Sequence, residues 1–250
     1  METNYNKLFI EVGSYQVNKH DNIACGDCVL LRKVPSEERC IAVLSDGLGS
    51  GIKANVLSTM TASMAMSFRV KHEPIMRTAR TIMDTLPVDS NRNISYSTFT
   101  IVDIDENGQT KIVEFDNPNI LLVRDGKVSH LNSKSYDLPI EENDKINHNR
   151  TIKQSDIKLL KDDRLVLVSD GVTQSGIGNM NMPFGWGKEV EDYIEKLIED
   201  NKNISARELS RKIVYKAGFN DELRPKDDTS CVVLYAREPR KLLICTGPPF

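Results

Sequence analysis

Residues 41–51 read IAVLSDGLGSG, and this stretch decides the fold. Its four leading apolar residues indicate a short buried strand, which the Ser-Asp-Gly that follows brings to an end. Gly49, Ser50 and Gly51 suit a turn and an N-terminal cap. Apolar residues then recur at spacings of three, four and five, so a helix with one buried face is expected over 52–68. The stretch therefore predicts a strand that ends in an acidic side chain and leads directly into a helix.

The same pattern returns later in the chain. Residues 165–171, LVLVSDG, again place Ser-Asp-Gly after an apolar run. A third acidic position, the pair Asp227-Asp228, comes just before a last expected strand over 231–235. Carboxylates at the ends of buried strands need a counter-charge, or they take up a proton. No Lys or Arg stands at matched positions beside all three, whereas a shared divalent cation would satisfy them together.

Asp-Gly is also a common turn dipeptide, and each occurrence has to be weighed against that reading. The Asp-Gly at 125–126 lies between two apolar runs and is interpreted only as a hairpin turn. Those at 46–47 and 170–171 differ, because each follows a buried-strand run and a serine. These two positions and the acidic pair before the last strand are therefore the candidate metal ligands.

The rest of the chain predicts antiparallel strands with helices inserted in pairs. Helices are expected over 74–86, 188–199 and 205–217, and strands over 8–17, 29–34, 98–104, 111–115, 120–123, 127–131, 151–157 and 164–168. The last helix begins with a capping box, Ser205 and Glu208, and is expected to stop at Gly218. The polar residues 132–149 are expected to form a long surface loop. Since strands and helices do not alternate singly, the pattern favours an α+β fold over a doubly wound parallel sheet.

The composition fits an ordinary soluble domain with a sizeable core, because 39% of the 250 residues are hydrophobic and 28% are charged. With 33 basic and 36 acidic residues, the net charge of −3 offers no field to attract nucleic acid or an anionic membrane. The N-terminus is polar, and no apolar run approaches the length of a membrane span. Five cysteines, an odd number, fit a reducing compartment. We expect a cytoplasmic protein with no nucleic-acid or membrane partner.

Four short motifs, in this order, resemble those of metal-dependent protein phosphatases: CGD at 25–27, LSDGLGSG at 44–51, VSDGVT at 168–173 and DDTS at 227–230. The first of them is similar to the Gly-Asp segment of the bacterial stage II sporulation phosphatase E branch. Motifs in order and in a fitting context are a strong signal, whereas any single one is weak. The resemblance covers roughly residues 8–236. It implies a phosphatase domain over 1–236 and a C-terminal tail over 237–250, which is either an edge strand or the start of a further region.

The resemblance implies a four-layer α–β–β–α sandwich, with two antiparallel sheets flanked by helix pairs, and a site for two Mn²⁺ or Mg²⁺ ions. The implied metal ligands are Asp27, Asp46, Gly47, Asp170, Asp227 and Asp228. Asp46 would bridge the ions, and the Gly47 carbonyl would help to bind one of them. Asp170 and Asp227 would bind the other ion, so these two and Asp46 are the implied catalytic residues. Asp27 would orient metal-bound water, and many relatives carry Asn in place of the final ligand.

The chemistry of such a site follows from its ligands. Hard oxygen donors select hard cations such as Mg²⁺ and Mn²⁺. Two ions about 4 Å apart can share a water, lower its pKa and present hydroxide to a phosphorus atom, so no covalent phosphoenzyme is needed. One departure concerns Leu48, because eukaryotic relatives carry a histidine there as a proposed general acid. Their phosphate-binding arginine also has no obvious match, and Lys19, Arg224 and Lys226 are candidates through proximity to the motifs.

The implied function is a serine/threonine protein phosphatase whose substrate, as in related proteins, is a phosphoprotein of the anti-anti-sigma type. Two alternatives stay open: a phosphatase-fold binding module without turnover, and a hydrolase of a small phosphorylated molecule. A homodimer or a regulatory protein partner also stays open. Cys25 and Cys28 form a lone Cys-x-x-Cys, and no second ligand pair exists to complete a zinc site.

Overall fold

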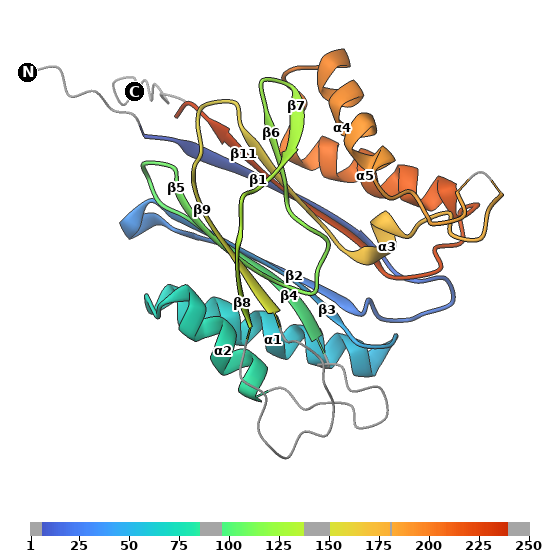
Figure 1. Ribbon diagram of the computed structural model, residues 1–250, viewed down its shortest axis with the longest axis horizontal. Helices are drawn as coiled ribbons and strands as arrows, with labels where there is room; N and C mark the ends of the chain where they lie inside the picture. The colour runs from blue at the N-terminus through green and yellow to red at the C-terminus, as the bar shows by residue number, and fades with distance from the viewer. Residues whose placement is uncertain (1–6, 86–96, 138–150, 181, 240–250) are drawn as a thin grey trace, which may run out of the picture.

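Two antiparallel sheets packed face to face form the centre of the protein (Figure 1). The computed structural model describes residues 7–85, 97–137, 151–180 and 182–239. One sheet has five strands in the order β1 (Phe9–Val17), β11 (Thr229–Arg237), β10 (Arg164–Val168), β6 (Leu121–Arg124) and β7 (Lys127–His130). The other has six strands in the order β2 (Asp27–Val34), β3 (Arg39–Gly47), β4 (Ser97–Ile104), β5 (Gln109–Phe115), β9 (Thr151–Lys158) and β8 (Lys134–Asp137).

Helices cover the outer face of each sheet, as Figure 1 shows. The described α-helices are α1 (Ile52–Val70), α2 (Ile75–Thr85), α3 (Asp170–Thr173), α4 (Glu189–Asp200) and α5 (Ala206–Asn220), and one short 3₁₀ turn, η1 (Pro35–Glu37), joins β2 to β3. The first two helices pack on the six-stranded sheet, and α4 and α5 pack on the five-stranded sheet. This arrangement confirms the predicted α+β fold and its four layers, α–β–β–α.

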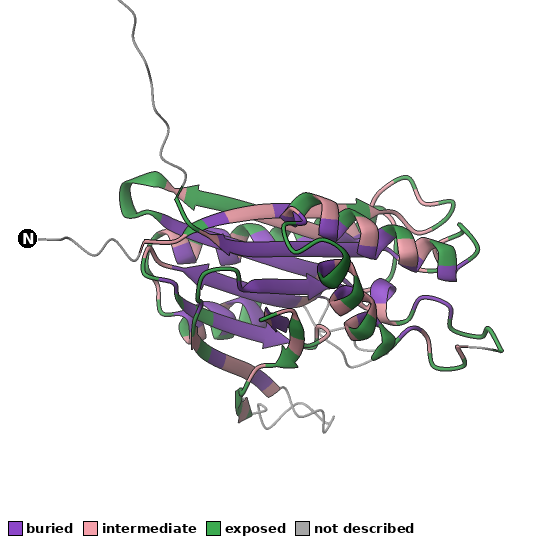
Figure 2. Cartoon of the chain, turned by 90° about the horizontal axis from the view of Figure 1, so that it is seen from above, coloured by how far each residue is buried: buried purple, intermediate pink, exposed green. Residues whose placement is uncertain are grey.

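Strand β3 shows how the layers are held together. In β3, Ile41 and Val43 point to the helix side and pack with residues of α1 and α2. Ala42 and Leu44 point the other way and pack between the sheets, against residues such as Leu165. The run is apolar on both faces because both faces are covered. Figure 2 shows the result, with buried residues concentrated along the central strands.

Two expectations about the elements are wrong. Strand β8 lies inside the expected surface loop over 132–149, and its exposed or half-exposed polar side chains gave no pattern to detect; residues 138–149 lie outside the described residues. Helix α5 also continues past Gly218, because it is fixed by packing near its end, where the Asn220 amide donates to Ser175 Oγ at 3.2 Å. Of the expected capping box, the Ser205 half is confirmed, since the Ser205 side chain accepts from the backbone N–H of Glu208, whereas the Glu208 side chain accepts from Arg211.

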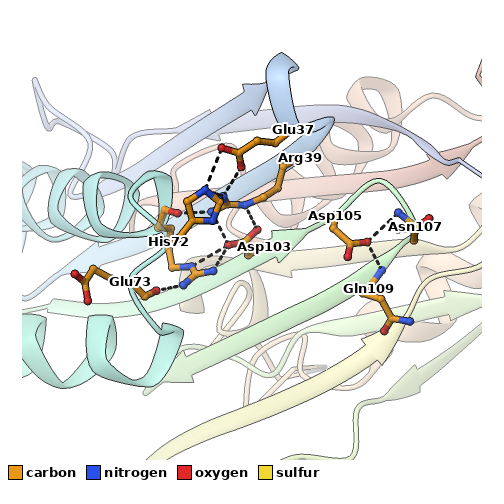
Figure 3. A network of polar contacts seen from close by, with 9 residues as sticks. Glu37, Arg39, His72, Glu73, Asp103, Asp105, Asn107 and Gln109 are labelled. Carbon is orange, nitrogen blue, oxygen red and sulfur yellow. Dashed lines mark hydrogen bonds and ion pairs between the residues drawn. The ribbon is translucent and has the colours of Figure 1, made fainter.

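A network of buried charges lies at the end of the sandwich where β3 begins (Figure 3). Asp103 of β4 accepts from Arg39 Nε at 2.8 Å and from Arg69 Nε of α1 at 2.8 Å. Arg39 also donates to Glu37 at 2.7 Å and contacts His72 at 3.1 Å. The two arginines and two carboxylates balance, and they tie η1, β3, β4 and the end of α1 together. The tail expected from residue 237 lies, from residue 240 on, outside the described residues.

Candidate metal centre

Aspartates from both sheets meet at the other end of the sandwich. Asp27 begins β2 and lies opposite Asp46, near the end of β3, in the antiparallel ladder. Asp170 begins α3 directly after β10, and Asp228 directly precedes the neighbouring strand β11. The Asp46 side chain interacts directly with that of Asp170, and the charges of Asp27 and Asp227 also act on it. The structure therefore brings the expected acidic residues together from segments far apart in the sequence.

Asp27 is the most unusual of these side chains. Its residue is 3% exposed, and neither carboxylate oxygen has a hydrogen-bond partner of normal geometry. Burial raises the pKa of this carboxyl group to about 7, although the nearby hydroxyls of Ser169 and Ser230 lower it in part. A buried carboxylate without partners is costly, since such groups are normally paired or bound to a cation.

The other carboxylates share this problem. Burial raises the pKa of Asp46 to about 9, and the charges of Asp27, Asp170 and Asp227 add to the effect. Burial is also the main reason why the pKa values of Asp170 and Asp227 are raised. Like charges gathered in a partly dry space disfavour ionisation of each member. A divalent cation among them would reverse that effect, because it favours the charged form of every carboxylate.

Both Ser-Asp-Gly motifs need glycine for close backbone contacts. A Cβ atom on Gly47 would lie 2.1 Å from the carbonyl oxygen of Ala54 in α1. A Cβ atom on Gly171 would lie 2.1 Å from the carbonyl oxygen of Asp228. Any side chain at either position would push apart segments that carry the aspartates. The Asp-Gly sequence at these two places is therefore a packing requirement of the site, unlike an ordinary turn.

The serines of the same motifs hold the strand ends in place, a role that the sequence analysis missed. Ser169 Oγ accepts from the backbone N–H of Ser230 at 2.9 Å and so joins the end of β10 to β11. Ser45 Oγ donates to the carbonyl of Thr98 at 2.9 Å, and Ser97 Oγ donates to the carbonyl of Asp46 at 2.8 Å. The repeated serine before Asp-Gly was visible in the sequence, but its partners come from distant strands.

Other polar groups surround the carboxylates. Gln174 Nε2 donates to Asp170 Oδ2 at 3.1 Å, and the backbone N–H of Lys19 donates to Asp228 Oδ1 at 2.9 Å. The Lys19 charge acts on Asp227 and partly opposes the rise in its pKa. The Lys226 ammonium group donates a hydrogen bond to the carbonyl oxygen of Ile177 at 2.5 Å. Of the three expected phosphate-binding cations, Lys19 has the clearest electrostatic link to the centre.

The donor set of this centre fits a hard divalent cation. Its members in the structure are carboxylate oxygens, and the Gly47 carbonyl at the end of β3 stays an expected ligand. Mg²⁺ keeps several waters when one or two carboxylates bind it. Among the described residues, no group of three or more His, Cys, Asp or Glu side chains is arranged so that it could hold a metal ion as it stands. The unpartnered oxygens of Asp27 and the raised pKa values nevertheless describe a site that lacks positive charge.

Comparisons with known proteins agree with this geometry. The family model described as stage II sporulation protein E (SpoIIE) matches residues 36–237. A solved structure of the PP2C phosphatase domain and a fragment of the regulatory domain of SpoIIE from Bacillus subtilis has a TM-score of 0.73 and 18% identity, over 94% of this chain and 65% of that chain. This chain thus spans less than two thirds of that structure. A search of curated protein sequences finds no match.

Two further structures share the fold. The RsbU and RsbW domains of a Mycobacterium tuberculosis protein give a TM-score of 0.69 at 12% identity, covering 94% of this chain and 62% of that one. RsbX in complex with magnesium gives 0.61 at 18% identity, covering 91% and 95%. The four-layer arrangement and these matches show that the chain has the PP2C-type phosphatase fold. Because the family match spans most of its length, the chain belongs to the stage II sporulation protein E family.

Proposed function

We propose that this chain is a metal-dependent serine/threonine protein phosphatase that hydrolyses a phosphoprotein with two Mn²⁺ or Mg²⁺ ions in the acidic centre. The observation that carries the proposal is Asp27, a buried carboxylate without partners beside Asp46. Membership of the SpoIIE family supports the phosphatase assignment. The magnesium complex of RsbX, a protein of the same fold, supports the choice of ion.

The aspartates would divide the work of holding the ions. Asp46, Asp170 and Asp227, with the Gly47 carbonyl, are the groups that would hold the ions. Bound ions of this kind lower the pKa of a water molecule and offset charge on phosphoryl oxygens. Asp227 is the ligand most exposed to the influence of Lys19, whose charge acts on it. Lys19 would therefore be the first cation to meet an incoming phosphoryl group.

The two remaining acidic residues would have supporting roles. Asp27 would hold and orient metal-bound water from its buried position in β2. Asp228 accepts a hydrogen bond from the backbone N–H of Lys19 at 2.9 Å, which ties its carboxylate to the residues that follow β1. Leu48 has no titratable group, so it cannot protonate the leaving oxygen. We propose Asp228 as the lesser metal ligand of the pair that it forms with Asp227, because many relatives carry Asn at this position.

The test is divalent-dependent hydrolysis of p-nitrophenyl phosphate and of a phosphoserine protein. We expect activity with Mn²⁺ or Mg²⁺, and a loss of roughly 10²-fold or more in Asp46→Ala. Absence of activity with every divalent ion, or equal activity in the variant, rejects the proposal. Calorimetric Mn²⁺ binding without turnover would favour an inactive phosphatase-fold binding module. Turnover of small phosphate esters but of no phosphoprotein would favour a small-molecule hydrolase.

The partners are part of the proposal. Similar structures include an RsbW domain beside an RsbU domain, and a protein described with the bacterial stressosome. We propose a small phosphorylated protein of the anti-anti-sigma type as substrate, with a regulatory protein or a second copy of the chain as a further partner. None of the described helices is both long and apolar enough to cross a membrane. A cytoplasmic location is proposed, and a phosphoproteome compared with and without the protein would identify the substrate.

A further inference from the structure

Residues 25–27 lead into β2, and each of their backbone carbonyls accepts a hydrogen bond from a different element. The first accepts from Asn55 Nδ2 in the first turn of α1 at 2.7 Å. The second accepts from the backbone N–H of Gly47 in β3 at 3.2 Å. The third accepts from Gln16 Nε2 in β1 at 3.4 Å. Two of the three donors are side-chain amides, and they come from different layers of the sandwich.

This segment needs outside support because its acidic side chain has none of its own. Both oxygens of Asp27 are buried, and although the hydroxyls of Ser169 and Ser230 lie nearby, no hydrogen bond of normal geometry fixes the direction of the carboxylate. The backbone also has little room, because a Cβ atom on Gly26 would lie 2.8 Å from Asp228 Oδ2. The direction of the Asp27 carboxylate is therefore set by the path of its backbone, which the two amides hold.

Gln16 connects this segment to the other sheet's half of the centre. Its amide group also donates to Ser230 Oγ at 3.0 Å and lies 3.9 Å from Cys25 Sγ. Ser230 is bonded through its backbone N–H to Ser169, the residue just before Asp170. One glutamine side chain thus links the Asp27 segment to the strand pair that positions Asp170.

We propose that Asn55 and Gln16 are positioning residues that hold Asp27 against the acidic centre and so set its affinity for a divalent cation. The inference rests on the proposed function only in that the centre binds such an ion. Groups that orient metal ligands typically change metal affinity 10- to 100-fold when they are removed. Both residues act through the backbone of 25–27.

The variants are chosen to remove the donors without changing charge. Asn55→Leu and Gln16→Met keep a similar volume, and neither adds a carboxylate that could itself attract a cation. Thr61→Val is the matched control on α1, because the hydroxyl of the buried Thr61 donates to the carbonyl of Leu57 at 2.9 Å, within the helix and not to residues 25–27. It removes a buried hydrogen bond of the same helix and leaves the Asp27 segment alone.

The experiment measures the Kd for Mn²⁺ by calorimetry on metal-free protein, the Tm without metal, and the Mn²⁺ dependence of p-nitrophenyl phosphate hydrolysis. We expect Asn55→Leu and Gln16→Met each to raise the Kd roughly tenfold or more. Thr61→Val should lower the Tm about as much as these two variants do, but it should keep the wild-type Kd. Excess Mn²⁺ should restore the kcat of both variants. If one variant fails to fold, the other tests the same claim from the opposite side of the segment.

The outcomes separate this inference from the proposed function. Unchanged Kd values in folded Asn55→Leu and Gln16→Met overturn the positioning role, even if the wild type is an active phosphatase. A weakened Kd in these variants supports the role, even if the wild type binds Mn²⁺ and hydrolyses nothing. A wild type that binds no Mn²⁺ overturns both. A Thr61→Val variant whose Kd rises as much as theirs also overturns the role, because the effect would then follow from general loosening of α1.

Discussion

Two buried aspartates of the six-stranded sheet have opposite surroundings. Asp103, 6% exposed, lies between the guanidinium groups of Arg39 and Arg69 (Figure 3). Asp27, 3% exposed, has no hydrogen-bond partner of normal geometry, and the charges nearest to it are other carboxylates. The Asp103 carboxylate is paired with two arginines of the fold, whereas the Asp27 carboxylate has no such pairing. We propose from this contrast that Asp103 holds the structure together, whereas Asp27 serves a bound cation.

One strand connects the two environments. Strand β3 begins at Arg39, in the charge network, and ends beside Asp46, in the acidic centre. Helix α1 runs alongside it, with Arg69 near its end in the network and Asn55 in its first turn near the centre. The balanced charge network can anchor one end of β3 and α1. The acidic centre at the other end can then contain carboxylates that repel one another and lower the stability of the metal-free protein. Functional sites commonly show such a cost to stability.

The largest expected effect on stability is at Asp103. Asp103→Asn would remove the buried carboxylate that Arg39 and Arg69 share and leave Arg39 with Glu37. Breaking a buried pair in this way typically lowers the free energy of unfolding by about 3–5 kcal/mol. Urea denaturation without metal measures this loss. The Kd for Mn²⁺ of the folded variant should stay at the wild-type value, because the network lies at the far end of β3. A loss under about 1 kcal/mol would mean that the network contributes no more than a surface ion pair.

Asp46→Asn should give the opposite pattern. The metal-free variant should be at least as stable as the wild type, since a buried carboxyl among like charges is removed. Its stabilisation by Mn²⁺, which for a single site is about 2.7 kcal/mol at an ion concentration of 100 times Kd, should disappear. Thermal unfolding with and without Mn²⁺ checks both statements. A marked loss of stability without metal would show that Asp46 is a structural residue like Asp103.

The acidic centre should also make the stability of the metal-free protein depend on pH. The raised pKa values of Asp27, about 7, and Asp46, about 9, mean that the folded metal-free protein holds protons that the unfolded chain releases near pH 4. Their contribution to stability is therefore present below about pH 4 and is lost as the pH rises toward 9. Unfolding at a series of pH values without metal should show this decline, and Asp46→Asn should flatten it.

Bound Mn²⁺ should reverse that trend, because ligands must lose their protons to bind it. The Mn²⁺-induced rise in Tm should consequently grow between pH 5 and pH 8. This range lies below the pKa of Asp46 and includes the pKa of Asp27. An Mn²⁺ effect that does not vary with pH would contradict the proposed role of these two carboxylates.

The smallest effect is expected at the exposed edge of the charge network. Glu37 bonds to Arg39 at 2.7 Å, but it is half-exposed and faces water. Exposed ion pairs add little to stability. Glu37→Gln should therefore shift the urea midpoint far less than Asp103→Asn. Equal shifts would show that the network acts as one unit up to its edge.

Much of this account could be predicted from the sequence because the centre lies in continuous motifs. The apolar run before Asp46 and the one before Asp170 marked strand ends, and the resemblance to metal-dependent phosphatases placed them in one fold. The start of β2 at Asp27, two residues earlier than expected, brings this residue into the ladder opposite Asp46. That extension could not be predicted, because Asp and Cys at 27–28 carry no strand signal.

The supporting contacts were out of reach of the sequence pattern for a different reason. Asn55 and Gln16 are single polar residues, and nothing local distinguishes them from surface residues. Their partners at 25–27 are backbone carbonyls, which every residue has. The Arg69–Asp103 pair likewise joins residues 34 positions apart. Such roles depend on how distant segments pack, so only the folded chain reveals them.

The most direct test of the central claim is anomalous scattering from crystals grown with MnCl₂. The claim is that carboxylates from both sheets gather around divalent ions. We predict two manganese peaks in the acidic centre, both coordinated by Asp46, with Asp170 or Asp227 on one of them. No peak there at saturating Mn²⁺, or manganese bound only elsewhere on the molecule, would contradict the account.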